Sequence, residues 1–135
     1  MLIKSKKVWS SGQFLPLILE VEDKKITAVY DYDAFDKVDY DFGTNRVLPG
    51  FIDVHTHGAY GYDTNDVNEE GLRNWTKNVV SEGVTSFLPT TITQTEEVLL
   101  KAVANVAKVY EEGYEGAEIL GIHFEGPYLD VEKRG

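Results

Sequence analysis

The sequence has no cysteine among its 135 residues. This absence excludes a disulfide framework, a thiolate metal site and a cysteine nucleophile. Long hydrophobic runs are also missing, and the N-terminus carries no apolar segment of the kind that forms a secretory signal. We therefore expect a cytoplasmic protein that does not enter a membrane.

Basic residues are few. The 13 lysines and arginines stand against 23 aspartates and glutamates, which gives a formal net charge of −10. A surface of that sign repels phosphate backbones and anionic lipids, so the composition argues against nucleic-acid and membrane partners. The hydrophobic share of 42% is typical of a globular protein with a real core, and the length suits one ordinary domain rather than a large enzyme.

Histidine is scarce as well, yet all three histidines fall in two short motifs, His-Thr-His at residues 55–57 and His-Phe-Glu at residues 123–125. Each motif closes an apolar run that is typical of a buried strand. Side chains two residues apart on a strand project from the same face, which pairs His55 with His57 and His123 with Glu125. Imidazoles and a carboxylate that meet at neighbouring strand ends suit zinc or iron. The pattern predicts part of a hydrolytic metal site.

The segment up to about Gly43 is β-rich and divided by short turns. Alternating apolar residues predict strands at Leu2–Trp9, Phe14–Val21 and Ile26–Tyr30. The acidic run from Asp31 to Asp41 predicts a solvated surface loop that leads into a short strand.

From Val47 onward, strands alternate with helices. The pattern predicts strands at Val47–His57, at Val84–Leu88, where Pro89 breaks the strand, and at Ile119–Glu125. Strands joined by helices of this length imply right-handed crossovers and a parallel sheet. Both histidine motifs then lie at carboxyl ends of strands, where α/β sheets and barrels place their active sites.

Capping residues set the expected helix bounds. Asn68 is expected to cap the first helix and Gly83 to end it, while Thr93, with Glu96 in capping-box spacing, opens a second helix that stops at Gly113. The expected buried stripes are Leu72, Trp75, Val79 and Val80 in the first helix and Leu99, Val103, Val106 and Tyr110 in the second.

For the remaining polar residues near the motifs, a functional role is harder to separate from a structural one. Glu125 ends an otherwise apolar strand, where a carboxylate is costly unless it binds a cation or a partner. His123 stays open between a metal ligand, a residue that supports a ligand and a structural residue. Asp53 is as compatible with orienting an imidazole as with a structural role. For three residues of the loop that follows, simple packing is favoured over shaping the mouth of the site: Tyr60, Tyr62 and Asp63.

Four segments together resemble a known family. Residues 47–58, VLPGFIDVHTHG, resemble the first barrel strand of the amidohydrolase superfamily. The loop at 58–63, the run at 83–90 and above all GIHFEGPY at 121–128 are similar to the N-acetylglucosamine-6-phosphate deacetylases within it. The His-x-His pair is common to the superfamily, whereas the His-Phe-Glu-Gly-Pro block is specific to these deacetylases.

The resemblance implies an α/β fold, the N-terminal part of a metal-dependent (β/α)8 TIM barrel. Residues 47–135 would supply the first three barrel strands, preceded by a small β-rich, sandwich-like domain at residues 1–46. It also implies hydrolysis of the N-acetyl group of N-acetylglucosamine 6-phosphate to glucosamine 6-phosphate and acetate, a step of amino-sugar catabolism. One or two divalent ions, zinc or iron, would be bound: Glu125 matches the principal ligand, and His55 and His57 match the pair that binds a second metal.

The resemblance further implies that the catalytic aspartate and two more histidine ligands lie beyond Gly135. We therefore expect this chain to be an incomplete, inactive piece of an enzyme that is a homodimer when full length. Two alternatives remain open: another amidohydrolase of the cyclic-amidase or deaminase type, and a non-catalytic metal-binding or structural module. A nucleobase deaminase with a His-x-Glu motif needs a Pro-Cys-x-x-Cys segment, which a chain without cysteine cannot supply.

Overall fold

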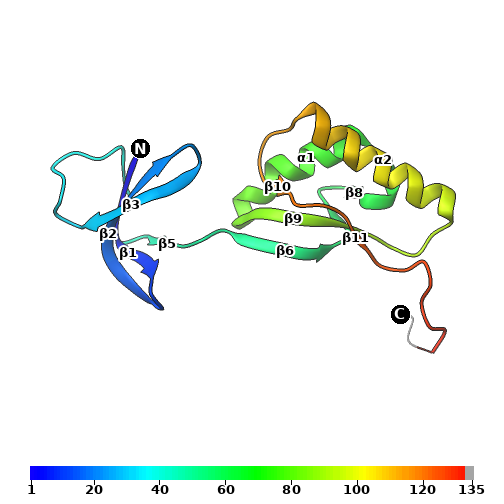
Figure 1. Cartoon of the computed structure of the whole chain (residues 1–135), viewed down its shortest axis with the longest axis horizontal. Helices are drawn as coiled ribbons and strands as arrows, with labels where there is room; N and C mark the ends of the chain where they lie inside the picture. The colour runs from blue at the N-terminus through cyan, green and yellow to red at the C-terminus, as the bar shows by residue number, and fades with distance from the viewer. Residues whose placement is uncertain (133–135) are drawn as a thin grey trace. The chain divides into compact units, whose positions relative to one another are not determined.

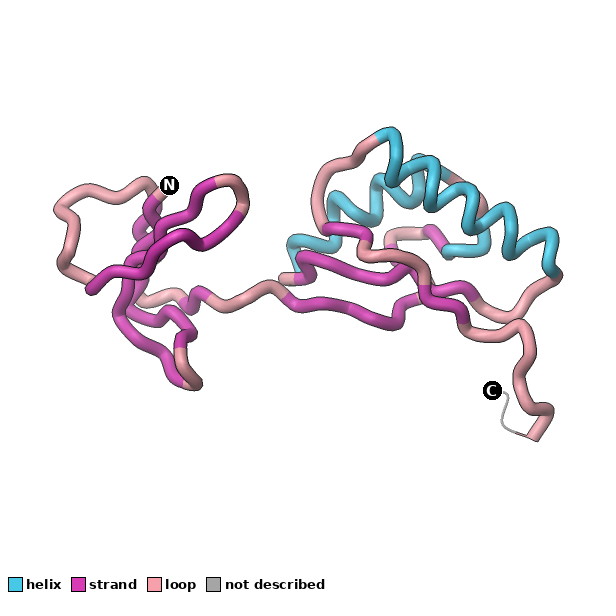
Figure 2. The backbone as a smooth tube through the Cα atoms, in the orientation of Figure 1, coloured by secondary structure: helices cyan, strands magenta, loops and turns pink. Residues whose placement is uncertain are grey.

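The computed structural model describes residues 1–132, and the chain divides into two units, Met1–Pro49 and Gly50–Gly135. No helix within the described residues is long and apolar enough to cross a membrane. Figure 1 gives the order of the elements, and Figure 2 shows that both long helices belong to the second unit.

The first unit is one five-stranded sheet. Its strands are β1 (Leu2–Ser10), β2 (Gln13–Glu22), β3 (Lys25–Asp31), β4 (Tyr40–Asp41) and β5 (Arg46–Val47). β1, β2 and β3 form an antiparallel meander, and β4 and β5 pair in parallel with β1. The two tight turns, at 11–12 and 23–24, have positive φ at both positions, as hairpins of this length require. The β-rich segment and the short strand after the acidic loop are confirmed; within residues 1–49 they form one sheet rather than two facing sheets.

The second unit is built on parallel strands. Its elements are β6 (Phe51–Thr56), β7 (Gly58–Ala59), β8 (Tyr62–Asp63), η1 (Thr64–Asp66), α1 (Glu69–Val79), η2 (Val80–Glu82), β9 (Val84–Thr91), α2 (Glu96–Glu112), β10 (Glu118–Ile119) and β11 (His123–Phe124). β9 is central: β6 pairs with it on one side, and β10 and β11 pair with it in succession on the other, all in parallel. The predicted parallel sheet with crossover helices is confirmed.

Helices α1 and α2 cover one face of this sheet (Figure 1). α1 begins where the Asn68 side chain accepts a hydrogen bond from the backbone of Gly71, as the sequence predicted. The core between helices and sheet centres on Trp75 and Phe87, whose ring centroids lie 4.6 Å apart. Its other buried members are Tyr62, Leu72, Val79, Val106, Val109, Ala117 and Ile119. This layer fixes the strands whose carboxyl ends carry the histidine motifs.

The predicted end of α2 at Gly113 is confirmed, whereas its predicted start and two of the predicted buried positions are wrong. The capping residue is Thr95, which accepts from the amide of Val98, so Thr93 lies outside the helix. Tyr110 is exposed, and its neighbour Val109 is buried in its place. Val80 is exposed because α1 ends at the residue before it and the chain tightens into a 3-10 turn.

Two predicted strands are interrupted and one is longer than expected. Val47 pairs with β1 in β5, and the next strand begins only at Phe51, since Pro49 has no amide hydrogen to donate. The third strand is split into β10 and β11, which flank residues 120–122. Pro89 does not break β9, because the pairing between β6 and β9 shifts register just there, and the amide of Thr56 donates to the Thr90 hydroxyl instead.

Candidate metal centre at the strand ends

Three side chains from different parts of the second unit converge at the carboxyl ends of the strands. His55 lies near the end of β6, His57 follows that strand, and Glu125 follows β11. Oε2 of Glu125 lies 2.9 Å from Nε2 of His55 and 3.2 Å from Nε2 of His57. One potential ligand atom of each residue lies within 4.8 Å of those of the other two. The predicted convergence of these three residues is confirmed as geometry; that they bind a metal stays a prediction.

His57 is held firmly by its surroundings. Its ring Nδ1 lies 3.2 Å from the carbonyl oxygen of Thr90 on β9, and its own carbonyl accepts hydrogen bonds from both the amide and the hydroxyl of Thr64. Thr64 is fully buried. The next residue, Gly58, has no room for a side chain, because a Cβ there would overlap the carbonyl oxygen of Tyr62 in the β7–β8 hairpin. The backbone on both sides of His57 is therefore fixed.

The contact between His57 and Glu125 favours a cation bound between the two side chains. A carbonyl oxygen only accepts hydrogen bonds, so the neutral His57 ring carries its hydrogen on Nδ1, facing Thr90. Its Nε2 then presents a lone pair to the Glu125 carboxylate 3.2 Å away. Two acceptors at that distance repel unless a proton or a metal ion lies between them. Two imidazole nitrogens and a carboxylate oxygen are a ligand set that fits zinc or iron.

The three candidate ligands are accessible from solvent. Their side chains are between 37% and 45% exposed. An exposed ion pair contributes little to folding, so the cluster is not explained by stability. Partial exposure is instead compatible with the approach of an ion and of a substrate.

His123 and Asp53 lie beside the cluster, and neither belongs to the group of residues whose potential ligand atoms converge. Nδ1 of His123 lies 2.8 Å from the carbonyl oxygen of Val54 on β6, and its ring stands 4.7 Å from that of His55. The Asp53 carboxylate accepts a hydrogen bond of 3.1 Å from the backbone amide of His55. Asp53 therefore orients the His55 backbone and not an imidazole.

The loop residues have packing roles within the described structure. Tyr60 donates a hydrogen bond to Glu82, and Asp63 caps the short helix η1 through the amide of Asn65. Tyr62 is 5% exposed, and burial raises the pKa of its hydroxyl to about 12. The preference for loop packing over a role at the mouth of the site agrees with these contacts.

The sequence patterns did not identify two residues that support the candidate metal centre. Thr64 and Thr90 hold the backbone around His57 through contacts that span 7 and 34 residues of chain. The only local signal is the position of Thr90 at the carboxyl end of a strand, one residue after Pro89. Threonine is too common at such places for that position to identify a site.

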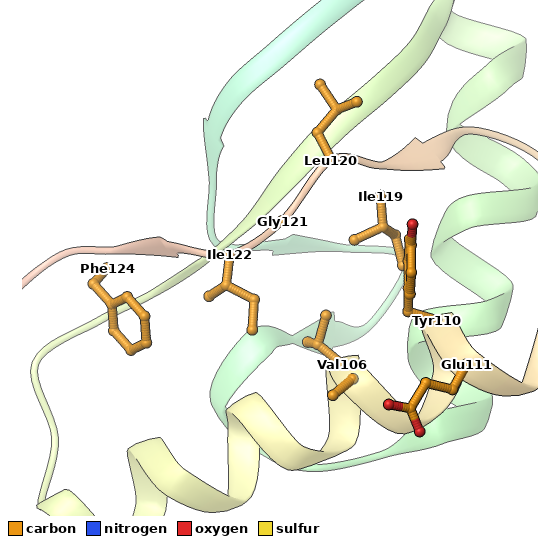
Figure 3. Close-up of a pocket in the computed structure, with 9 residues that line it drawn as sticks. Val106, Tyr110, Glu111, Ile119, Leu120, Gly121, Ile122 and Phe124 are labelled. Carbon is orange, nitrogen blue, oxygen red and sulfur yellow. The ribbon is translucent and has the colours of Figure 1, made fainter.

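An apolar groove of the second unit lies away from the candidate ligands. It has a volume of about 480 Å³ and runs between α2 and the β10–β11 segment (Figure 3). Its lining is mostly apolar, with Ile122 facing Val106 across it, and includes Phe124. Because neighbouring residues on a strand face opposite ways, Phe124 lies on the other face from His123 and Glu125. The groove is therefore not part of the metal centre.

Residues 46–133 match the amidohydrolase family. The chain belongs to the amidohydrolase family. The match includes every residue of the candidate metal centre, so the cluster at the strand ends lies in the part of the chain that is characteristic of amidohydrolases.

Relatives within the amidohydrolases are N-acetylglucosamine-6-phosphate deacetylases. The chain is 36% identical to the enzyme of Vibrio furnissii over 115 residues, which are 84% of this chain and 29% of that protein. It is 41% identical to the human enzyme over 98 residues, which are 70% of this chain and 24% of that protein. The chain thus spans about a quarter to a third of the length of these relatives.

Solved structures of N-acetylglucosamine-6-phosphate deacetylases are similar to the chain in fold. The N-acetyl-D-glucosamine-6-phosphate deacetylase of Mycobacterium smegmatis superposes with a TM-score of 0.86 at 27% identity, covering 100% of this chain and 38% of that one. A mutant of that enzyme, solved in complex with N-acetyl-D-glucosamine-6-phosphate, matches with a TM-score of 0.84 over 96% of this chain and 33% of that one.

Proposed function

We propose that this amidohydrolase chain forms the N-terminal part of an enzyme that removes the acetyl group of N-acetylglucosamine 6-phosphate, giving glucosamine 6-phosphate and acetate. The observation that carries the proposal is the convergence of His55, His57 and Glu125 at the strand ends of a chain similar to such deacetylases. A related structure with this phosphorylated amino sugar bound makes it the first substrate to test.

The proposed architecture is a (β/α)8 barrel. Its first three strands would be β6, β9 and the β10–β11 segment, from residue 47 onward, and residues 1–46 would belong to a small sandwich-like domain. Within residues 1–132, β6 pairs only with β9, so its other edge is open, and Phe51, Ile52 and Val54 are all more than half exposed. Further barrel strands would pair with such an edge and cover the apolar groove beside α2.

The candidate ligands fit zinc or iron, bound as one or two ions. Glu125 would be the principal ligand, because its carboxylate supplies the negative charge of the cluster and lies within 3.2 Å of both imidazoles. His55 and His57 would complete the site, with the ring of His57 set in the right tautomer by Thr90. A bound divalent ion would polarise the acetyl carbonyl and lower the pKa of a coordinated water. The proton-transfer aspartate and further histidine ligands are proposed to lie outside these 135 residues.

Acetate release tests the proposal. The protein expressed from the whole gene is incubated with N-acetylglucosamine 6-phosphate, and acetate and bound metal are measured together. Glu125→Gln keeps the size of the side chain but removes its charge, so we expect loss of metal and a fall in turnover of orders of magnitude. Glu115→Gln is the matched control, because Glu115 lies in the loop after α2, pairs with Lys77 of α1 and is 78% exposed; its turnover should equal that of wild type.

Two results would count against this function. Wild-type metal content and turnover in Glu125→Gln would remove the role given to that residue. Hydrolysis of a cyclic amide or a nucleobase in preference to the amino sugar would leave the chain an amidohydrolase but with a different substrate.

A further inference from the structure

His123 connects two strands that are not neighbours. It stands on β11, whereas its ring nitrogen Nδ1 lies 2.8 Å from the carbonyl oxygen of Val54 on β6. Between the two strands lies β9, which pairs with both. The side chain of His123 therefore reaches across the middle strand at the end of the sheet that carries the candidate ligands.

This contact fixes the tautomer of the neutral His123 ring. The Val54 carbonyl only accepts, so Nδ1 of His123 carries the hydrogen and the neutral ring has its lone pair on Nε2. Such a donor to a backbone carbonyl is how proteins commonly set the orientation of an imidazole.

His55 depends on its neighbours for its orientation. Unlike His57, it forms no hydrogen bond through Nδ1 to any residue in the 1–132 range. Its ring is instead flanked by two others at steep angles, that of His57 at 5.1 Å and 89° and that of His123 at 4.7 Å and 77°. Edge-to-face contacts of this kind favour one orientation of the ring over others. Nε2 of His55 then faces Glu125 at 2.9 Å.

We propose that His123 is a positioning residue for the metal centre: anchored to Val54, its ring holds that of His55 so that Nε2 points at Glu125. The proposal assigns a task to the one histidine that is not a candidate ligand, and it rests on the metal centre proposed above. His123 contributes no atom to the ligand set.

The test compares two substitutions in the protein expressed from the whole gene. His123→Phe keeps a flat ring but removes the donor to Val54, and His123→Asn restores a donor close to the position of Nδ1. Cobalt(II) replaces the natural metal, and its visible spectrum and dissociation constant are recorded. We expect His123→Phe to weaken cobalt binding about 10- to 100-fold and to shift the spectrum, as for other residues that orient ligands. His123→Asn keeps a donor to Val54 but has no ring beside His55, so it should recover neither the affinity nor the spectrum.

A control separates positioning from stability. Tyr60→Phe removes the hydrogen bond from Tyr60 to Glu82 in the same unit and should leave the cobalt spectrum as in wild type. If His123→Phe lowers the melting temperature but keeps the wild-type cobalt affinity and spectrum, His123 is merely structural and the proposal is overturned.

A metal-free measurement keeps this inference distinct from the proposed function. In protein labelled with ¹⁵N-histidine, the His123 signals should report a hydrogen on Nδ1, and the ring signals of His55 should move in His123→Phe but not in Tyr60→Phe. If wild type binds no cobalt while these signals behave as expected, the metal centre fails and the positioning of His55 stands. Unmoved His55 signals refute the positioning.

Discussion

Tyr62 links the loop after the candidate ligands to the core, and its hydroxyl makes a sharp test of the structure. It is 5% exposed, and the buried side chain of Asn105 donates a hydrogen bond of 3.3 Å to its oxygen. Tyr62→Phe removes that acceptor and leaves the amide of Asn105 without it. We expect a loss of about 1 kcal/mol in the free energy of unfolding near neutral pH.

The pH dependence gives a second and larger signal. Burial raises the pKa of Tyr62 from 10.0 in the unfolded chain to about 12 in the folded chain, although the hydrogen bond from Asn105 works in the opposite direction. A raised folded-state pKa means that the stabilisation is complete below pH 10 and is lost as the pH rises through 12. Between pH 8 and pH 11.5 the wild type should therefore lose about 2 kcal/mol more than Tyr62→Phe.

Urea unfolding at both pH values measures this difference. In a Trp9→Phe background the emission maximum of Trp75, which is 1% exposed, reports on the second unit alone. Tyr128→Phe is the control, because that side chain is 97% exposed and has no packing to lose. If wild type and Tyr62→Phe lose the same free energy of unfolding between the two pH values, Tyr62 is not buried as described. The position of the β7–β8 hairpin next to His57 would then be wrong as well.

Two further predictions concern the core and the ligands. Trp75→Ala should lower the free energy of unfolding by about 3–5 kcal/mol, because its fully buried ring packs on Phe87; a change below about 1 kcal/mol in urea unfolding would contradict the core. Replacing His55 and His57 together by asparagine should reduce acetate release less than Glu125→Gln does, in step with the metal lost per protein, since Glu125 carries the only charge among the three. Metal analysis beside acetate release checks this order, and a double variant that is less active than Glu125→Gln would reverse the assignment of the principal ligand.

Local patterns in the sequence were sufficient for the arrangement of strands and helices and for the candidate ligands. Alternation within a strand and the spacing of His55, His57 and Glu125 are properties of neighbouring residues, and the parallel sheet follows from the helices between strands. Asn68 was found for the same reason, because a cap acts within one turn of its helix.

The wrong predictions of a helix cap, a buried position and a strand end have a common cause. In each case two local signals compete, or the outcome depends on a single residue. Thr93 has capping-box spacing to Glu96, but Thr95 caps the helix without a box. Tyr110 and Val109 differ by about 100° around the helix. A pattern of apolar residues three or four positions apart cannot decide which of the two is buried. Proline ends many strands because it has no amide hydrogen to donate. Pro89 does not, because it lies at a register shift where the pairing of β6 with β9 does not need that hydrogen bond.

The contacts that align the ligands could not be found in this way, because they come from the middle strand of the sheet. β9 contributes no candidate ligand, but its last two carbonyl groups hold the other two strands: that of Thr90 meets Nδ1 of His57, and that of Thr91 accepts from the amide of Glu125 at 3.3 Å. A shift of one residue in β9 would exchange the faces of both threonines and separate His57 from Glu125. The ligands are therefore visible in the sequence as a pattern, whereas their alignment depends on the register of a strand that carries none of them.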